Sequence, residues 1–258
     1  MPPENTETKK KDGVILLIDM LGTKRIMERE NPEKFMEDMR LFEDHLRKSI
    51  EKGVEDSRLF EKEFSIQIHQ FSDTYIIEAT SSNSIGALLV LLLRIQTFYA
   101  ITFSSSRFFR GAISVGTYYT DNTRIIGPAI NDAGEWYESA EWIGIHFTPK
   151  TSYAIKKELL LKDNFLRHCV IEYNIPLKNN NEMKGYVWNW PQISFINTDI
   201  IISEDNINHY KRQILDTFSK HPIGKNEYLK YKNTLDFIDH VFKNISWTGG
   251  KNINLDFD

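Results

Sequence analysis

An unbroken apolar run that ends on a carboxylate constrains the fold of this chain more than any other feature. Residues 14–18 are all large and apolar, and Asp19 follows them directly. Continuous runs of this kind are typical of a strand that is covered on both faces. The run therefore predicts a buried strand that delivers Asp19 to its end.

The segments that follow alternate between the residue spacing of helices and that of strands. Helices are predicted over residues 31–53, 83–103, 131–141 and 151–161, and strands over 64–69, 74–77, 110–119 and 144–147. With the first strand, they give the order strand–helix–strand–strand–helix–strand across residues 14–150. That order predicts an α+β, ferredoxin-like sandwich, in which an antiparallel-rich sheet carries its helices on one face.

The chain divides into three predicted parts. Residues 1–12 are polar and charged and are predicted to be a disordered lead-in. Residues 13–162 form the sandwich domain, and residues 163–258 a C-terminal α/β extension that packs on it. The elements predicted in the extension are a strand over 168–173 and amphipathic helices over 204–219 and 225–243.

Composition excludes several classes of protein. A net charge of −4 over 258 residues supplies no broad basic field for coating a nucleic acid. The single cysteine, Cys169, excludes an intramolecular disulfide framework and a Cys-rich zinc site, and its apolar neighbours predict an inert buried thiol. The most apolar stretch, 85–103, contains Arg94 and Gln96, which favours a core or interface helix over a membrane span. We expect a cytoplasmic protein that binds a small ligand.

Two carboxylates at strand ends are the candidate metal ligands. Asp19 ends the first strand, and Asp73 lies at the bend between the strands predicted over 64–69 and 74–77. Either residue alone also suits an ordinary turn or helix cap. In a ferredoxin-like sheet, however, the first strand and this hairpin are neighbours, so the two side chains can share a pair of divalent ions about 3.5–4 Å apart.

The turn that follows Asp19 has the composition of a phosphate-binding loop. Gly22 and Thr23 are small, and Lys24 adds a cation beside them. Backbone N–H groups from Leu21 to Thr23 are predicted to cradle a phosphate at the start of the next segment.

Three segments, in their order and spacing, resemble the class III nucleotidyl cyclases, the catalytic domain of adenylate and guanylate cyclases. Residues 19–23 resemble the motif of the first metal ligand and the phosphate loop, and residues 71–73 resemble the hairpin of the second metal ligand. Residues 110–116 and 127–133 resemble the strand and the helix that carry the ribose-positioning Asn, here Asn131. The resemblance covers a little over half of the chain.

The sequence departs from that family where purine cyclases read the base. His69 stands four residues before the second metal ligand, in place of Lys or Glu, and Arg124 stands seven residues before Asn131, in place of Asp or Cys. Glu135 replaces the Arg that steadies the transition state, and Gly144 lies near the position of the phosphate-binding Lys. The domain is therefore either degenerate or specific for another base, with cations from elsewhere. The candidate cations are Lys24, Lys150, Arg107 and Arg110.

Retention of both metal-binding carboxylates favours an active enzyme. Residues 131–140 and 185–188 resemble the bacterial pyrimidine cyclases of the Pycsar antiphage system. That resemblance implies a homodimeric uridylate cyclase, which converts UTP to 3′,5′-cyclic UMP and pyrophosphate and thereby signals to a separate effector. It further implies two Mn²⁺ or Mg²⁺ ions bridged by Asp19 and Asp73, and a ribose held by the partner subunit's Asn131 at the dimer interface. Arg110 is the accompanying catalytic candidate.

Base choice is predicted to depend on His69, Arg124 and Tyr75. Arg124 offers only hydrogen-bond donors, which suits O4 of uracil and opposes the amino group of cytosine, although N3 and O2 of cytosine also accept. His69 and Tyr75 are bulky enough to fill the space of a purine. UTP is thus the expected substrate, with CTP as the alternative.

A second class of function is a non-catalytic, nucleotide-binding signalling module, which Glu135 favours. A palm-type nucleotidyltransferase is disfavoured because the bend at residues 71–73 lacks the Gly-Gly-acidic pattern.

Overall fold

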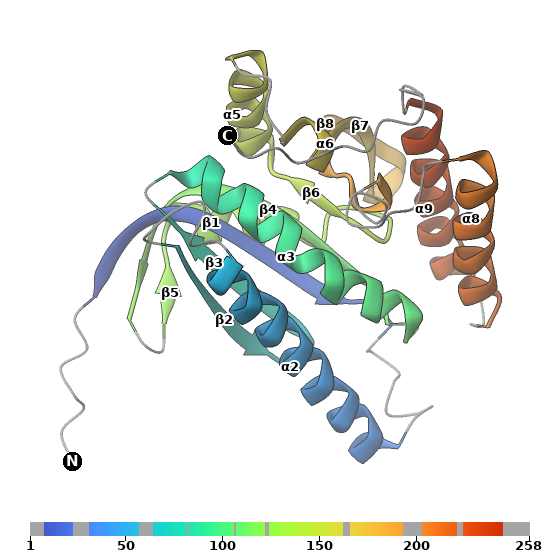
Figure 1. Ribbon diagram of the computed structural model, residues 1–258, viewed down its shortest axis with the longest axis horizontal. Helices are drawn as coiled ribbons and strands as arrows, with labels where there is room; N and C mark the ends of the chain where they lie inside the picture. Colours follow the sequence, from blue (N-terminus) through green and yellow to red (C-terminus); the bar gives the residue numbers. More distant parts are fainter. Residues whose placement is uncertain are drawn as a thin grey trace.

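The computed structural model describes residues 8–22, 31–56, 64–81, 83–105, 107–121, 124–161, 166–192, 203–220 and 224–244. They form one mixed sheet with helices packed around it (Figure 1). The strand order is β2 (Ser65–Phe71), β3 (Thr74–Thr80), β1 (Lys9–Met20), β4 (Phe109–Thr120), β6 (Ile145–Phe147), β8 (Asn181–Trp188) and β7 (Val170–Leu177). The short β5 (Ile125–Ile126) pairs with β4.

The first four strands confirm the predicted ferredoxin-like α+β arrangement. β1 lies between β3 and β4 and is antiparallel to both, and β2 and β3 form the predicted hairpin at the edge. β1 is longer than predicted and begins at Lys9, so the end of the predicted disordered lead-in is strand, since it pairs with the far end of β4.

Apolar side chains of β1 alternate between two cores, as its unbroken apolar run predicts. Val14, Leu16 and Ile18 belong to the main core. Ile15 and Leu17 belong to a smaller core with Tyr118 and two alanines of helix α4, Ala129 and Ala133. Asp19 is therefore on the same face of β1 as Ile15 and Leu17.

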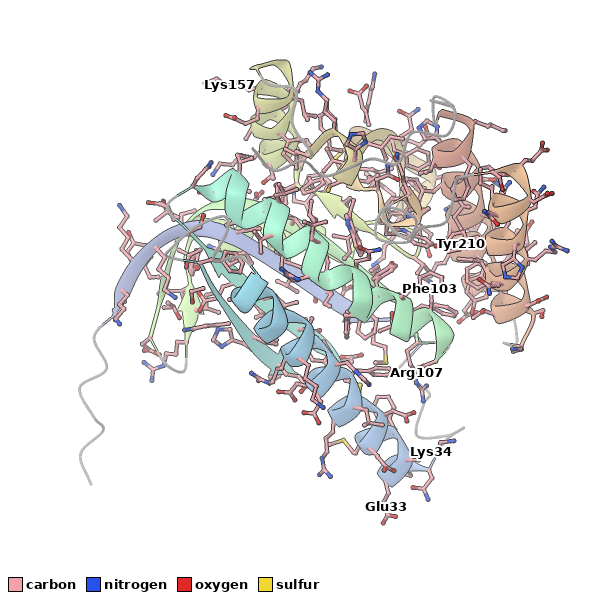
Figure 2. The ribbon with its side chains drawn as sticks, viewed as in Figure 1. Glu33, Lys34, Phe103, Arg107, Lys157 and Tyr210 are labelled. Atoms are coloured by element: carbon pink, nitrogen blue, oxygen red, sulfur yellow. The ribbon has the colours of Figure 1, made fainter. Side chains whose placement is uncertain are left out.

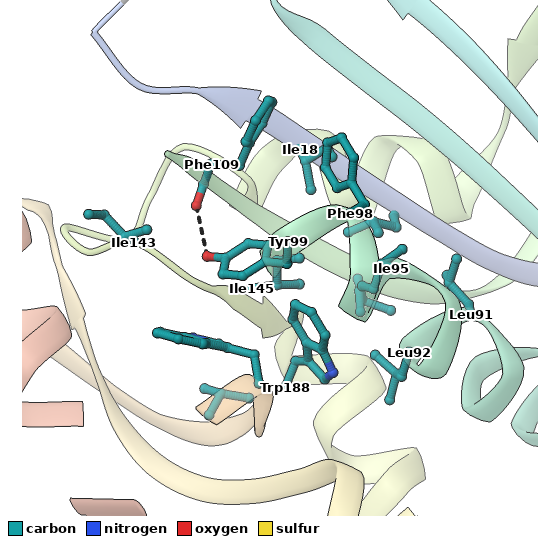
Figure 3. Packing of buried hydrophobic residues seen from close by; sticks show 14 of the residues in the cluster. Ile18, Leu91, Leu92, Ile95, Phe98, Tyr99, Phe109, Ile143, Ile145 and Trp188 are labelled. Carbon is teal, nitrogen blue, oxygen red and sulfur yellow. Dashed lines mark hydrogen bonds between the residues drawn. The ribbon is translucent and has the colours of Figure 1, made fainter. Parts of the chain in front are cut away.

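Helices α2 (Pro32–Asp56) and α3 (Ser84–Ser104) lie side by side across the face of the main core (Figure 1). Asn31 caps α2 by accepting from the Glu33 backbone N–H at 2.8 Å, as the Asn-Pro start predicts. Figure 3 shows how α3 fills this core with Leu91, Ile95 and Phe98. No helix of the described ranges is long and apolar enough to cross a bilayer, α3 included.

The opposite face carries the short helix α4 (Pro128–Trp136), so not every helix shares one face as the sequence predicts. Small alanines let α4 approach β1 and β4 closely. The helix begins at Pro128 after Gly127, whose φ of 126° favours glycine. Asn131 therefore lies inside the helix rather than at its cap, and its side chain is exposed.

The C-terminal part continues the sheet rather than forming a separate layer. β6 pairs with β4 in parallel, and β8 joins β6 to β7. Strands on both sides of the predicted boundary therefore belong to one sheet. Helices α5 (Pro149–Leu161), α6 (Leu166–Cys169), α8 (Glu204–Ser219) and α9 (Lys225–Asn244) and the 3₁₀ turn η3 (Lys178–Asn180) complete this part, with α8 beside α9 in Figure 1. Cys169 is buried, as predicted.

Asp132 anchors α4 to the sheet. Its Oδ2 accepts from the hydroxyls of Ser114 on β4 and Thr148 before α5, both at 2.7 Å. Hydrogen bonds to a carboxylate are among the stronger ones in proteins, so this residue fixes how α4 sits on the sheet.

We expect Asp132→Ala to lower the free energy of unfolding by about 2–3 kcal/mol, because the hydroxyls of two buried residues lose a charged acceptor. Urea unfolding measures the change. Glu135→Ala, on the exposed side of the same helix, is the control and should leave stability nearly unaltered. Equal losses in the two variants would contradict the anchoring role.

Candidate active site

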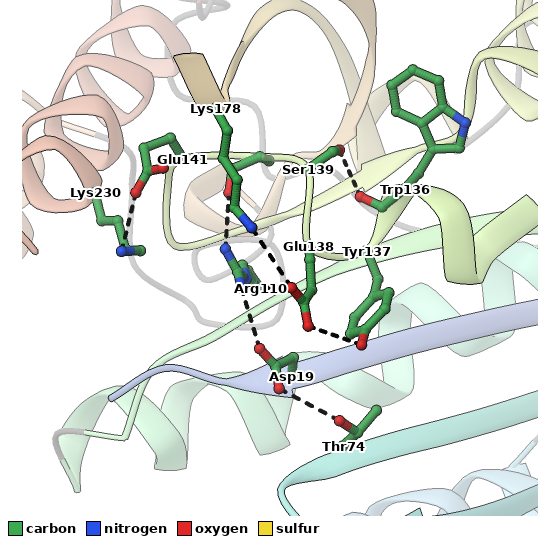
Figure 4. Close-up of polar contacts among 11 residues, drawn as sticks. Asp19, Thr74, Arg110, Trp136, Tyr137, Glu138, Ser139, Glu141, Lys178 and Lys230 are labelled. Atoms are coloured by element: carbon green, nitrogen blue, oxygen red, sulfur yellow. Dashed lines mark hydrogen bonds and ion pairs between the residues drawn. The ribbon is translucent and has the colours of Figure 1, made fainter. Parts of the chain in front are cut away.

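Asp19 lies next to the β2–β3 turn that carries Asp73. Register places Asp19 opposite Thr74, whose hydroxyl donates to Asp19 Oδ1 at 3.4 Å (Figure 4). The backbone N–H of Met20 donates to the carbonyl of Asp73 at 3.1 Å. Ser72 makes the tight turn with a φ of 56°. Pairing of β1 with β3 thus brings Asp73, more than fifty residues away in the sequence, into the turn beside Asp19, where its charge acts on the Asp19 carboxylate.

Arg110 lies on the other side of Asp19, opposite it in the β1–β4 register. Its guanidinium Nη2 is 3.5 Å from Asp19 Oδ2 and 3.8 Å from a carboxylate oxygen of Glu138. Nη1 donates to the Ala140 carbonyl at 3.4 Å. Because Arg110 is only 8% exposed, it is a fixed cation shared between two carboxylates.

Glu138 belongs to the segment that follows α4, and three groups hold it. The Tyr137 hydroxyl donates to it at 3.0 Å, Lys178 Nζ lies 3.6 Å away, and Arg110 approaches from the sheet. The hydrogen bond from Tyr137 is the main reason that the Glu138 pKa is lowered. Burial, aided by Glu138, raises the pKa of Tyr137 to about 12. Glu138 therefore stays ionised beside the site (Figure 4).

Burial raises the pKa of Asp19 above its ordinary value. The charge of Arg110 opposes this effect, while the negative charges of Asp73 and Glu138 add to it. The surroundings of Asp19 therefore disfavour its ionised form, and a bound cation would stabilise that form.

The donor set fits a hard divalent cation bound with a phosphorylated ligand. Asp19 and Asp73 supply carboxylate oxygens, and Mg²⁺ commonly uses one or two carboxylates with substrate phosphates and water. Across the described ranges, no group of three or more His, Cys, Asp and Glu side chains forms a metal cage.

His69 lies on the same face of the sheet as Asp19, further along the hairpin. Its Nε2 is 3.6 Å from the carboxylate of Glu78, which is only 1% exposed and also contacts Lys11 Nζ at 3.5 Å. Arg124 is exposed in the loop before β5, where its backbone N–H donates to Asp121 at 2.8 Å. Arg124 is therefore near the end of β4 remote from Arg110, whereas His69 is level with Leu17, two residues along β1 from Asp19.

Tyr75, the third base-reading candidate, is not on this face. It is fully buried in the main core between Phe98 and Phe109. Register explains its placement: Tyr75 pairs with Ile18, and both point toward α2 and α3.

The turn after β1 uses one of its predicted phosphate-binding groups internally. The backbone N–H of Leu21 donates to the Phe108 carbonyl at 2.8 Å. Gly22 adopts a φ of 87°, a conformation that favours glycine. Thr23 and Lys24 lie outside the described residues.

Two other predicted cations have different surroundings. Arg107 pairs with Asp38 of α2 at 2.9 Å, so it serves the packing of α2. Lys150 lies near Gly116, beside α4. Of the basic candidates that the structure describes, Arg110 is the one in contact with Asp19.

Sequence reasoning missed Glu138, Lys178 and Glu78 as parts of this face. Glu78 had a usable signal, because a carboxylate in the apolar β3 segment has to find a partner when it is buried. Glu138 and Lys178 had none, since only the fold of the 137–141 segment and the start of η3 brings them to Arg110.

No protein-family model and no curated protein matches the chain. Among solved structures, the adenylyl cyclase CyaB from P. aeruginosa is similar with 13% identity and a TM-score of 0.49, over 70% of this chain and 95% of that one. An adenylate/guanylate cyclase/hydrolase from Silicibacter pomeroyi has 18% identity and a TM-score of 0.46, over 70% and 98%. A bacterial light-regulated adenylyl cyclase has 12% identity and a TM-score of 0.49, over 84% and 60%. These identities are too low to transfer an activity.

The raised pKa of Asp19 predicts a pH-dependent loss of stability. The folded chain holds this proton more tightly than the unfolded chain does, so stability falls as pH rises from the ordinary value of 3.8 through the folded pKa. Asp19→Asn has no such proton. In metal-free buffer, the unfolding free energy of Asp19→Asn relative to wild type should therefore increase over this window.

Urea unfolding from about pH 3 to about pH 7 measures this difference. Asp44→Asn, at an exposed site on α2, should run parallel to wild type. If the unfolding free energies of Asp19→Asn and wild type differ by the same amount at every pH, the raised pKa does not belong to Asp19.

Proposed function

We propose that the chain is a homodimeric pyrimidine nucleotide cyclase that converts UTP to 3′,5′-cyclic UMP and pyrophosphate. The observation that carries the proposal is that strand pairing puts Asp73 in the turn beside Asp19, where its charge acts on that carboxylate, and that the buried guanidinium of Arg110 contacts Asp19. Two carboxylates and a fixed cation are the groups that phosphoryl transfer needs, because catalysis there is mostly positioning and charge neutralisation.

Asp19 and Asp73 would hold the Mn²⁺ or Mg²⁺ ions. When bound, such ions neutralise the triphosphate and make the ribose 3′-hydroxyl easier to deprotonate. The electrostatics support this role, since Asp73 and Glu138 both disfavour the charge on Asp19 in the absence of a cation.

The reaction forms a bond between the 3′-oxygen and the α-phosphorus and breaks the bond to the pyrophosphate oxygen. The hydroxyl proton goes to solvent, and pyrophosphate leaves with the negative charge. The proposed role of Arg110 is to stabilise charge that builds up on the α-phosphoryl oxygens, and its contact with the carboxylate of Asp19 supports this role. In this role it substitutes for the family arginine whose position Glu135 occupies.

The turn at Gly22 and the exposed Asn131 complete the proposed site. Gly22 lies two residues after the end of β1 and is exposed, so its backbone N–H is available to a phosphate. Asn131 points away from its own sheet, on the side of α4 opposite the buried Ala129 and Ala133. A residue in that position can orient the ribose in a second subunit, which supports a head-to-tail dimer with shared sites.

His69 and Arg124 are the proposed base-reading residues. His69 is on the same face of the sheet as Asp19, level with Leu17, and Arg124 is near the end of β4 remote from Arg110. The donors of Arg124 suit O4 of uracil, which favours UTP over CTP. Tyr75 has no part in this proposal because it faces the main core.

The proposed biological role is production of a second messenger in antiphage defence, read by a separate effector. It rests on the resemblance of residues 131–140 and 185–188 to pyrimidine cyclases.

One observation favours a second function, a nucleotide-binding module without turnover. Glu135 is exposed on α4, four residues after Asn131, where the family carries a catalytic arginine. In that case Arg110 would only balance the charge of Asp19. Stabilisation by a nucleoside triphosphate without any product would identify this function.

Incubation of the purified chain with each of the four ribonucleoside triphosphates and Mn²⁺, followed by mass spectrometry, tests the cyclase. We expect cyclic UMP as the main product. Asp19→Ala and Asp73→Ala should each reduce turnover by about 10³-fold or more, because each removes one of the two carboxylates that would hold the metal ions.

Asp44→Ala removes an exposed carboxylate from α2 and is the control that should keep wild-type turnover. Cyclic CMP as the main product would mean that the substrate is CTP rather than UTP, while the proposed reaction stays the same. Absence of any cyclic product from an intact dimer would refute the proposed cyclase activity.

Subunit mixing tests the shared site. Asp73→Ala and Asn131→Ala should each be nearly inactive alone, because each removes one half of every site. Mixed after dissociation in equal amounts, they should regain about a quarter of wild-type turnover, since half of the dimers then contain one intact site of two. No recovery, with exchange verified by mass spectrometry, would show that both residues act within one subunit.

A further inference from the structure

The guanidinium of Arg110 lies between two carboxylates at the proposed site. Its Nη2 is 3.5 Å from Asp19 Oδ2 and 3.8 Å from Glu138 Oε2, so a small rotation of the group favours one contact over the other. Its Nη1 donates to the Ala140 carbonyl at 3.4 Å. Because that hydrogen bond and burial hold the guanidinium, Arg110 can exchange carboxylate partners without leaving the site.

A divalent cation at Asp19 would compete with this guanidinium. Both are positive, and Oδ2 of Asp19 is the oxygen that Arg110 contacts. Like charges repel at short range, most of all where burial limits screening by water, so a metal ion and a guanidinium at the same carboxylate disfavour each other. Metal binding therefore requires another partner for the positive charge of Arg110.

Glu138 is that other partner. The Tyr137 hydroxyl holds its Oε1 at 3.0 Å, which leaves Oε2 directed to Arg110 and to Lys178 Nζ, 3.6 Å away. The side chain of Asp19 is 14% exposed, whereas that of Glu138 is 50% exposed. A guanidinium that moves from Asp19 to Glu138 thus exchanges a buried partner for a more exposed one and releases the buried carboxylate.

Neighbouring basic side chains have other partners. Arg107, labelled in Figure 2 beside the end of α3, pairs with Asp38 of α2 at 2.9 Å. Lys178 pairs with Glu138. In the part of the chain that the structure describes, Arg110 is the basic side chain that contacts Asp19, so the competition with a metal ion falls on it.

We propose that Glu138 is a positioning residue, which receives the guanidinium of Arg110 when a divalent cation occupies Asp19. Glu138 thereby frees Asp19 for the metal ion and keeps Arg110 at the site. The inference rests on the metal-binding role of Asp19 in the proposed function. It does not depend on cyclisation, because binding of Mn²⁺ alone is sufficient to test it.

Titration of Mn²⁺ into the nucleotide-free, full-length chain, with the free ion measured by electron paramagnetic resonance, tests the exchange. Glu138→Gln should weaken Mn²⁺ binding about fivefold or more, because Arg110 then remains on Asp19. Glu182→Gln removes an exposed carboxylate at the start of β8 and is the matched control, which should leave the affinity unchanged. Equal effects of the two substitutions would overturn the proposal.

Glu138→Asp separates the contact from the charge. It keeps the negative charge, but the side chain is one methylene shorter and draws the carboxylate back from Arg110. It should therefore weaken Mn²⁺ binding nearly as much as Glu138→Gln does. Wild-type affinity in Glu138→Asp would show that only the net charge matters, and would overturn the positioning role.

Arg110→Met completes a double-mutant cycle. Alone it should tighten Mn²⁺ binding, because the competing cation is gone, and Glu138→Gln should then have no further effect. A loss that is equally large without Arg110 would show that Glu138 holds the ion itself, and would overturn the proposal. Circular dichroism verifies folding; if Arg110→Met does not fold, the comparison of the Glu138 and Glu182 variants decides.

Failure of the proposed function gives a different result. A chain that makes no cyclic product, yet binds Mn²⁺ with the Glu138→Gln and Glu182→Gln difference, refutes the cyclase and keeps the exchange. A chain that makes a cyclic nucleotide with a Mn²⁺ affinity that is insensitive to Glu138 keeps the cyclase and refutes the exchange. No saturable Mn²⁺ binding to the wild-type chain would also refute the exchange, while product formation decides the cyclase separately.

Discussion

Antiparallel pairing of β1 with both β3 and β4 is the constraint on which the rest of the structure depends. It places Asp19 opposite Thr74 on one side and opposite Arg110 on the other. The pleat then turns these side chains to the face that α4 covers, while alternate residues fill the core under α2 and α3. A shift of one residue in either register would move Asp19 into the apolar core.

Charge balance around Arg110 links the sandwich to the C-terminal part. Arg110 is shared between Asp19 and Glu138, and Glu138 is held in turn by Lys178 at the start of η3. Glu141, in the same segment, pairs with Lys230 of α9 at 3.0 Å. The extension therefore braces the 138–141 segment, which in turn holds Arg110 against Asp19. In this way the extension supports the proposed site.

Continuity of the sheet also brings the extension against α3. Because β6, β8 and β7 continue from β4, α8 lies against α3. Tyr99 of α3 packs edge-on against Trp188 of β8 and donates a hydrogen bond to the Phe109 carbonyl. Arg110 follows Phe109, so the same strand, β4, contacts this aromatic packing and contributes Arg110 to Asp19.

The sequence alone determined the order of elements, because apolar periodicity follows directly from which faces are buried. It also singled out Asp19 and Asp73, since a carboxylate that ends an apolar strand or sits in a hairpin bend is visible without coordinates. Only the tertiary structure decided that Tyr75 faces the core and that Glu138 reaches Arg110. Strand register sets the face of Tyr75, and the packing of distant segments sets the partner of Arg110; neither is encoded in local spacing.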